Sequence, residues 1–146
     1  MRVLIVDDSR IVRERVAAML SEIQDGIDVV GQAGEVNEAI SAFHRLKPEA
    51  VILDIAMPGG SGVDVLQAIK QYGPSPVIMM LSNHSHPHYR KKCMETGADF
   101  FYDKSSEFCK VAETFRRLTQ DPPWDRRGDI CDGCSQPAFA CSRPRR

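Results

Sequence analysis

The sequence predicts an α/β protein in which helices cover both faces of a parallel sheet of five strands. Short apolar runs rich in Val, Ile and Leu recur along the chain, as is typical of buried parallel strands. Amphipathic stretches with helical spacing separate these runs, and turn signals with Gly and Pro lie between them. Because the two kinds of segment alternate, a doubly wound sheet with five helices is expected.

Each predicted strand is a short run of apolar residues that ends at a turn signal or a charged residue. The first, Val3-Leu4-Ile5-Val6, ends at Asp7-Asp8, and the third, which contains Val51-Ile52-Leu53, ends at Asp54. The last is aromatic, Phe100-Phe101-Tyr102, and aromatic residues favour strands. The five predicted strands are 3–6, 28–33, 50–54, 77–81 and 100–102.

Each predicted helix has apolar residues three or four positions apart. Ser9 stands where a side chain can cap the first helix. Lys47-Pro48 closes the second, because the residue before proline disfavours the helical backbone. Tyr72-Gly73-Pro74 ends the third. The five apolar stripes fall within 11–23, 36–46, 65–72, 89–96 and 108–118.

Composition divides the chain into one domain and a tail. Residues 1–118 are enough for a domain with its own core, whereas residues 119–146 are polar, irregular in pattern and rich in Cys and Arg. The net charge is −1, which does not favour a nucleic-acid or membrane partner. No apolar stretch reaches the roughly 20 residues of a membrane span. The chain starts directly with a strand and without a leader, so a cytoplasmic location is expected.

Three carboxylates follow two of the predicted strands. Asp7-Asp8 ends the first and Asp54 the third, and open parallel sheets bind ligands where their strands end. Three negative charges placed close together repel unless a cation joins them, and an all-oxygen cluster suits Mg²⁺. One carboxylate is then free to attack a phosphoryl group whose charge the metal has partly neutralised.

Further polar residues complete a pattern that resembles the response-regulator receiver domain of two-component signalling over about residues 1–118. Besides Asp7-Asp8, the matching segments are Asp54 to Gly62, Leu81-Ser82 and Asp103-Lys104, each after a different strand and in the family's order. The resemblance implies a flavodoxin-like fold with strand order 2-1-3-4-5. It implies a stand-alone bacterial phosphoprotein, phosphorylated by a sensor histidine kinase or a histidine phosphotransfer protein.

The resemblance also implies a role for each matching residue. Asp54 would be the phosphoacceptor, and Lys104 would pair with the phosphoryl oxygens. Asp8 would be the main Mg²⁺ ligand, joined by Asp7, Asp54 and the backbone carbonyl of Ala56. Ser82 would donate its hydroxyl to the phosphoryl group. Phe101, three residues before Lys104, would be an aromatic switch that follows Ser82; a fixed core position is the equal alternative.

The signal would then pass to an unidentified protein target. In a receiver, the surface formed by the fourth helix, fifth strand and fifth helix changes on phosphorylation, and the same surface is one route to a homodimer. The chain would catalyse only its own phosphotransfer and dephosphorylation. A Mg²⁺-dependent phosphohydrolase is the alternative, but that class places its nucleophile in an Asp-x-Asp pattern, and Asp7-Asp8 are adjacent.

The sequence departs from the family after Lys104, where receivers commonly have a proline in a cis peptide. Here Ser105 follows, and a cis bond before a non-proline residue costs about 3 kcal/mol, so a trans peptide is expected. Ser105 is a candidate cap of the last helix. Asn83 and His84 stand after Ser82, where substituents should alter water access to the phosphoryl group and its lifetime.

The His and Cys residues leave several interpretations open. His84, His86 and His88 alternate, which favours solvated imidazoles over a metal site. Cys93 and Cys109 lie on predicted helices and are expected to be ordinary, partly buried thiols. The tail carries a C-x-x-C pair and a third cysteine, for which zinc binding, redox chemistry or no specific role remain; they are Cys131, Cys134 and Cys141. Zinc or redox chemistry there would make the chain a dual sensor.

Overall fold

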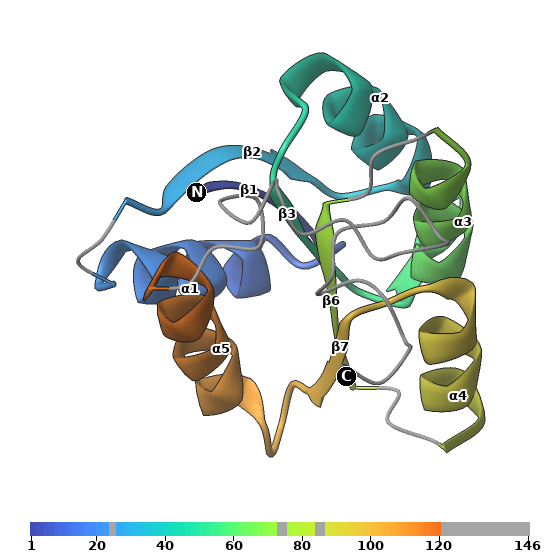
Figure 1. The fold of residues 1–146 in the computed structure, drawn as a ribbon. Coiled ribbons are helices and arrows are strands. Elements are labelled where there is room, and N and C mark those ends of the chain that lie inside the picture. The colour runs from blue at the N-terminus through green and yellow to red at the C-terminus, as the bar shows by residue number, and fades with distance from the viewer. Residues whose placement is uncertain (24–25, 73–75, 84–86, 121–146) are drawn as a thin grey trace, which may run out of the picture.

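The computed structural model describes residues 1–23, 26–72, 76–83 and 87–120, and its main feature is a five-stranded parallel sheet (Figure 1). The strands lie in the order β2-β1-β3-β6-β7. Counting only the strands of this sheet, the order is 2-1-3-4-5, which confirms the predicted fold class. The strands are β1 (Arg2–Val6), β2 (Asp28–Ala33), β3 (Ala50–Leu53), β6 (Val77–Ser82) and β7 (Phe100–Asp103).

Five helices cover the two faces of this sheet. Helices α1 and α5 lie on one face, and α2, α3 and α4 lie on the other (Figure 1). The helices are α1 (Arg10–Ser21), α2 (Val36–Leu46), α3 (Gly62–Tyr72), α4 (Pro87–Thr96) and α5 (Phe108–Gln120). None of the described helices is long and apolar enough to cross a membrane.

The sheet is buried on both faces, which explains why its strands are continuous apolar runs. In β1, Leu4 and Val6 pack into the cluster under α2, α3 and α4. Val3 and Ile5 point the other way and pack into the cluster under α1 and α5. All four side chains are at most 1% exposed. The register of β1 is therefore fixed, because a shift by one residue would exchange its two faces and bring Asp7 into the core.

The register aligns the ends of the strands at one edge of the sheet. Val6 pairs with Leu53, so the residues that follow them, Asp7 and Asp54, begin their loops side by side. Further along the sheet, Ser82 pairs with Asp103, which places Lys104 just beyond the end of β6. All the polar residues predicted to act together thus leave the sheet at its carboxyl edge.

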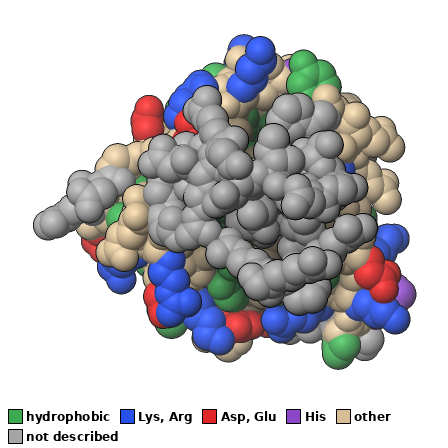
Figure 2. Space-filling model, in the orientation of Figure 1, with side chains coloured by type: hydrophobic (Ala, Val, Ile, Leu, Met, Phe, Trp, Pro, Cys, Tyr) green, Lys and Arg blue, Asp and Glu red, His purple; other side chains and the backbone are tan. Residues whose placement is uncertain are grey.

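Charged side chains of both signs lie on one face of the molecule. On the face drawn in Figure 2, basic and acidic side chains of the described residues lie interspersed around the edge. This distribution agrees with the net charge of −1 for the whole chain.

The structure differs from the predicted elements in the loop after β3, at the start of α4 and at the end of α5, and several strand ends differ by one residue. The loop after β3 contains a small antiparallel hairpin of β4 (Ala56–Met57) and β5 (Gly60–Ser61), where only a loop was expected. Helix α4 begins at Pro87 rather than Tyr89, since proline is well suited to the first turn of a helix. Helix α5 continues to Gln120, two residues past position 118, where the sequence predicted the end of the domain. That domain boundary stays a prediction.

Candidate functional site

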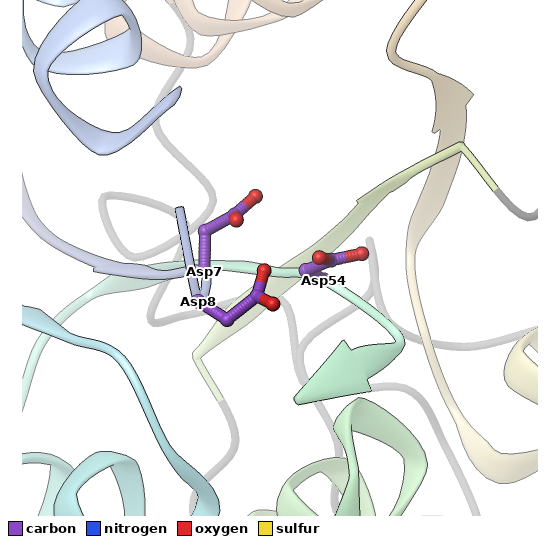
Figure 3. A group of neighbouring side chains, drawn as sticks. All are labelled: Asp7, Asp8 and Asp54. Atoms are coloured by element: carbon purple, nitrogen blue, oxygen red, sulfur yellow. The ribbon is translucent and has the colours of Figure 1, made fainter. Parts of the chain in front are cut away.

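Three carboxylates meet where β1 and β3 end. Oxygen atoms of Asp7, Asp8 and Asp54 all lie within 4.8 Å of one another. Figure 3 shows the side chains leaving adjacent strand ends, with the Asp8 carboxylate turned toward Asp54. Asp7 and Asp54 are buried, at 3% and 5% exposure, whereas Asp8 faces solvent. The cluster is therefore open to solvent on the Asp8 side and closed behind Asp7.

Lys104, which directly follows the edge strand β7, supplies a positive charge to this cluster. Its Nζ contacts Asp7 Oδ2 and lies 3.1 Å from Asp54 Oδ2, and its side chain is only 11% exposed. The backbone holds the residue in place, because the Lys104 N–H donates to the carbonyl of Ser82 at 3.1 Å. Residues from three distant segments of the sequence thus form one ionic group.

The electrostatics of the group show an excess of negative charge. Burial raises the pKa of Asp7, and the charge of Asp54 acts in the same direction; Lys104 and the Ser9 N–H oppose it. Burial would lower the pKa of Lys104, but the hydrogen bonds and charges of Asp7 and Asp54 outweigh it and raise that pKa. One ammonium group among three carboxylates leaves a site that attracts a further cation.

The donor set fits Mg²⁺. All three side chains offer carboxylate oxygens, which Mg²⁺ prefers. Their spacing, within 4.8 Å, is comparable to the roughly 4 Å between opposite ligands of an octahedral Mg²⁺ shell. Ala56 lies in the exposed first position of β4, two residues after Asp54. The three carboxylates together could therefore hold a Mg²⁺ ion at this edge of the sheet.

The backbone around Asp54 is fixed from two directions. Its N–H donates to the carbonyl of Val6 at 2.9 Å, which ties it to β1. Its carboxylate oxygen Oδ1 accepts from the Ile55 N–H at 2.7 Å, which leaves Oδ2 facing Lys104. These contacts hold the carboxylate in one orientation at the end of β3.

Gly62 was quoted in the motif without a role, and the structure assigns it one. Its N–H donates to the carbonyl of Ile55 at 2.7 Å, which closes the loop that carries the β4–β5 hairpin. A Cβ atom at this position would lie 1.8 Å from the backbone oxygen of Asp54. Only glycine permits this approach. The sequence signal was the run Gly59-Gly60-Ser61-Gly62, but it does not show which glycine is needed.

Ser82 and Phe101, the two predicted switch residues, are both buried. Ser82 ends β6 at 0% exposure, and Phe101 lies in β7 at 3% exposure within the cluster under α2, α3 and α4. The guanidinium carbon of Arg90, on α4, is 5.8 Å from the centre of the Phe101 ring. Phe101 therefore occupies an inward position. Its predicted role as a switch stays a prediction.

The segment after Lys104 corrects one prediction. Ser105 does not cap α5, which begins three residues later at Phe108. Instead, Asp103 closes the turn, because its Oδ1 accepts from the N–H groups of Ser105 at 2.7 Å and Ser106 at 3.2 Å. No cis peptide occurs among the described residues, so the Lys104–Ser105 bond is trans as expected.

The structure places some of the remaining candidates and leaves the others outside its described residues. Cys93 is fully buried in α4, and burial raises the pKa of its thiol. Cys109 is exposed on α5, contrary to the expectation of partial burial. His88 is exposed in α4. The candidates outside the described residues are His84, His86, Cys131, Cys134 and Cys141, so the zinc and redox interpretations stay predictions.

Comparisons with known proteins agree with this geometry. The response regulator receiver domain family matches residues 3–116. A protein-glutamate methylesterase/protein-glutamine glutaminase of Idiomarina loihiensis is 35% identical over 122 residues, covering 82% of this chain and 31% of that protein. Response regulator protein VraR of Staphylococcus saprophyticus is 30% identical over 116 residues, covering 80% of this chain and 55% of that protein. The chain thus spans between about a third and about half of the length of these two relatives.

Solved structures show the same similarity. The response regulator domain of Thermotoga maritima CheB superposes with a TM-score of 0.71 at 28% identity, covering 82% of this chain and 93% of that one. A chain from the Borrelia burgdorferi complex of CheX and CheY with BeF3 and magnesium matches with a TM-score of 0.71 at 26% identity. The match covers 82% of this chain and 88% of that one.

Proposed function

Because this chain belongs to the response regulator receiver domain family, we propose that Asp54 accepts a phosphoryl group. The donor would be a phosphohistidine on a sensor histidine kinase or a histidine phosphotransfer protein. One observation carries the assignment to Asp54: its Oδ2 lies 3.1 Å from Lys104 Nζ, beside two further carboxylates at the same sheet edge. This group of one ammonium and three carboxylates supports the roles proposed for Asp54 as nucleophile, Lys104 as its cation partner and the three carboxylates as metal ligands.

The transfer would proceed by in-line displacement at phosphorus. An oxygen of the Asp54 carboxylate forms the new P–O bond, while the P–N bond to the donor imidazole breaks and its electron pair returns to the ring. When bound, Mg²⁺ supplies charge neutralisation to the phosphoryl oxygens. Asp8, Asp7, Asp54 and the Ala56 carbonyl would hold it. Lys104 already contacts Asp54 and would pair with the phosphoryl oxygens that arrive there.

The signal would leave the site through β6 and β7. Ser82 is fully buried at the end of β6, and its carbonyl accepts from the N–H of Lys104, whose side chain contacts Asp54, so Lys104 links Ser82 to the proposed phosphoacceptor. Phe101 lies in the neighbouring strand against Arg90 of α4. We propose that movement of Ser82 and Phe101 alters the surface formed by α4, β7 and α5, where a target protein or a second copy binds.

We propose that the chain acts by protein contact in the cytoplasm and catalyses only its own phosphotransfer and dephosphorylation. Methylesterase and glutaminase activities belong to the names of much longer relatives, and the match spans 31% of the one from Idiomarina loihiensis. Turnover of an external ester by the purified chain would contradict this part of the proposal.

The test is phosphorylation of the full chain by acetyl phosphate with Mg²⁺, followed by intact-mass spectrometry. Wild type should gain one phosphoryl group, and hydroxylamine should remove it, because acyl phosphates react with that nucleophile. Asp54→Asn should gain none, since an amide is not a nucleophile toward phosphorus. Asp28→Asn is the matched control at an exposed strand residue, and it should behave as wild type. A modified Asp54→Asn, or an unmodified folded wild type, would contradict the assignment.

A further inference from the structure

Arg13, near the start of α1, binds the backbone of the Asp7-Asp8 segment through its side chain. Its Nη1 donates to the carbonyl oxygen of Asp7 at 2.6 Å. That carbonyl belongs to the peptide that links Asp7 to Asp8. On its other side, the Asp7 N–H donates to the carbonyl of Ala33 in β2 at 3.0 Å. The peptides before and after Asp7 are therefore both fixed, one by the sheet and one by the Arg13 side chain.

The guanidinium of Arg13 keeps its position although one of its donors is left unsatisfied. The Nε atom of Arg13 is buried and has no hydrogen-bond partner in the part of the chain that the structure describes. A buried donor without an acceptor is costly, and native proteins rarely keep one without a reason. The contact with the Asp7 carbonyl is the interaction that places the side chain there.

Gly34, directly after β2, leaves the room that this placement needs. A Cβ atom at position 34 would lie 3.1 Å from Arg13 Nη1 and 3.8 Å from the Asp7 carbonyl oxygen. The first distance is tighter than ordinary van der Waals contact, so a side chain at this position would press on the guanidinium. A glycine directly after β2 and an arginine of α1 thus fit each other around the same carbonyl.

Arg13 acts on the backbone rather than on the carboxylates. The pKa of Asp7 is set by burial, Lys104, the Ser9 N–H and Asp54. The same segment is also tied to α1 at Ser9, whose N–H donates to Asp7 Oδ1 at 2.9 Å and whose carbonyl accepts from the Arg13 N–H at 3.0 Å. Asp8 lies between these two anchored residues and faces solvent.

We propose that Arg13 is a positioning residue of the cation site. By holding the Asp7 carbonyl, it fixes the plane of the Asp7–Asp8 peptide and with it the direction of the Asp8 carboxylate. The inference rests on the proposed function in one respect, the assignment of Asp8 as a Mg²⁺ ligand. Groups that orient metal ligands from outside the metal shell typically change metal affinity by about 10- to 100-fold when removed.

The test is calorimetric titration of Mg²⁺ into the full chain without a phosphodonor. Arg13→Met should weaken Mg²⁺ binding by about 10-fold, whereas Arg13→Lys should keep part of the affinity because one donor can still reach the carbonyl. Gly34→Ala should also weaken Mg²⁺ binding, because the added methyl group would press on the guanidinium while Arg13 itself is retained. Arg10→Met is the matched control: it removes the same charge from the same helix, at a side chain that is 82% exposed, and should bind as wild type.

Phosphorylation by acetyl phosphate at increasing Mg²⁺ separates positioning from general damage. Arg13→Met should need more Mg²⁺ for half of its maximal rate yet reach the wild-type plateau, since Asp54 and Lys104 are intact. Equal Mg²⁺ affinity in folded Arg13→Met and Arg10→Met would overturn the inference. If Arg13→Met does not fold, Arg13→Lys and Gly34→Ala decide by the same titration, and wild-type affinity in both would also overturn it.

Different results would contradict the proposed function of Asp54 and the proposed role of Arg13. A wild-type chain that takes up no phosphoryl group would contradict the function and leave the titration result standing. Unchanged Mg²⁺ affinity in the Arg13 variants of a chain that is phosphorylated normally would contradict the inference alone.

Discussion

At the scale of single residues, the site is governed by an imbalance of charge. Lys104 pairs with two carboxylates, Asp7 and Asp54, that are each at most 6% exposed, and Asp8 adds a third negative charge beside them. Removal of one partner from a buried ionic group leaves the others unpaired in a poorly solvated place, and that costs more than the group ever contributed.

Lys104→Met should therefore destabilise the Mg²⁺-free protein by about 3 kcal/mol at neutral pH. Urea unfolding measures this loss. Saturating Mg²⁺ should restore more stability to the variant than it adds to the wild type, because the metal replaces the missing charge. Lys110→Met removes the same charge from a solvent-exposed pair with Glu107 and should cost far less stability, because solvent screens that pair. Equal losses in the two variants would contradict the account.

Asp99, just before β7, gives a pH dependence that is separate from the site. Burial raises its pKa, although the Ile78 N–H, which donates to Oδ2 at 2.8 Å, and the charge of Lys70 oppose the shift. Because the folded-state pKa lies above the unfolded one, the stability that Asp99 contributes is fully present in acid. It is lost as the pH rises through the folded-state value.

Asp99→Asn removes this titration and keeps an acceptor for the Ile78 N–H. The free energy of unfolding of the variant, minus that of the wild type, should therefore increase between pH 3 and pH 7. Urea unfolding at several pH values measures the difference between the two proteins. A difference that stays constant across this range, or that falls as the pH rises, would show that burial of Asp99 is not the dominant effect.

At the scale of elements, the turn after β3 depends on one close approach. Gly62 begins α3, and its Cα lies so near the Asp54 carbonyl that a Cβ would be 1.8 Å from the oxygen. The obstacle is backbone of the sheet, which cannot move aside as a flexible side chain can. Relief would require α3 or the end of β3 to shift, and both pack into the core.

Gly62→Ala should accordingly destabilise the protein by about 3 kcal/mol or more. It should also slow phosphorylation of any folded fraction, because the carbonyl it displaces belongs to Asp54. Gly59→Ala is the control in the same hairpin: Gly59 has φ +85° with nothing within 4 Å of a new Cβ. That variant should lose only the roughly 1–2 kcal/mol of a left-handed backbone. Thermal unfolding and the acetyl phosphate assay give both readouts, and similar losses would contradict the steric argument.

At the scale of the whole molecule, the described domain contains both halves of the core and the complete acidic site. The cluster under α1 and α5 includes Phe115, at 0% exposure, so α5 is an integral part of the fold. The predicted boundary at 118 cuts α5 before its end at Gln120. A chain ended after Gln120 keeps every described element.

We expect that shortened chain to unfold within about 2 °C of the full chain, since roughly 4 °C corresponds to 1 kcal/mol in a domain of this size. Its Mg²⁺ affinity and its phosphorylation rate should also match. The same pair of proteins tests the zinc interpretation of the tail: zinc retained by the full chain and absent from the shortened one would support it. A large loss of stability on shortening would instead show that the tail contributes to the domain.

The sequence by itself determined the fold class and most of the site, because these depend on local patterns. Apolar runs buried on both faces identify parallel strands, and polar residues directly after such runs lie at one edge of the sheet whatever the details of packing. Asp7, Asp8 and Asp54 could therefore be grouped before any contact was known, and the resemblance to receiver domains added Lys104. Ser9 was predicted as a cap for the same reason, and its hydroxyl accepts from the Val12 N–H at 3.4 Å.

The tertiary structure decided what depends on distances between segments that are remote in the sequence. Gly62 is indispensable because a strand carbonyl lies against it, and nothing local distinguishes it from Gly59. Arg13 looks like any polar residue of an amphipathic helix until the Asp7 carbonyl and Gly34 are placed around it. Local periodicity shows which face of an element is buried, but only packing shows which atom of another element that face meets.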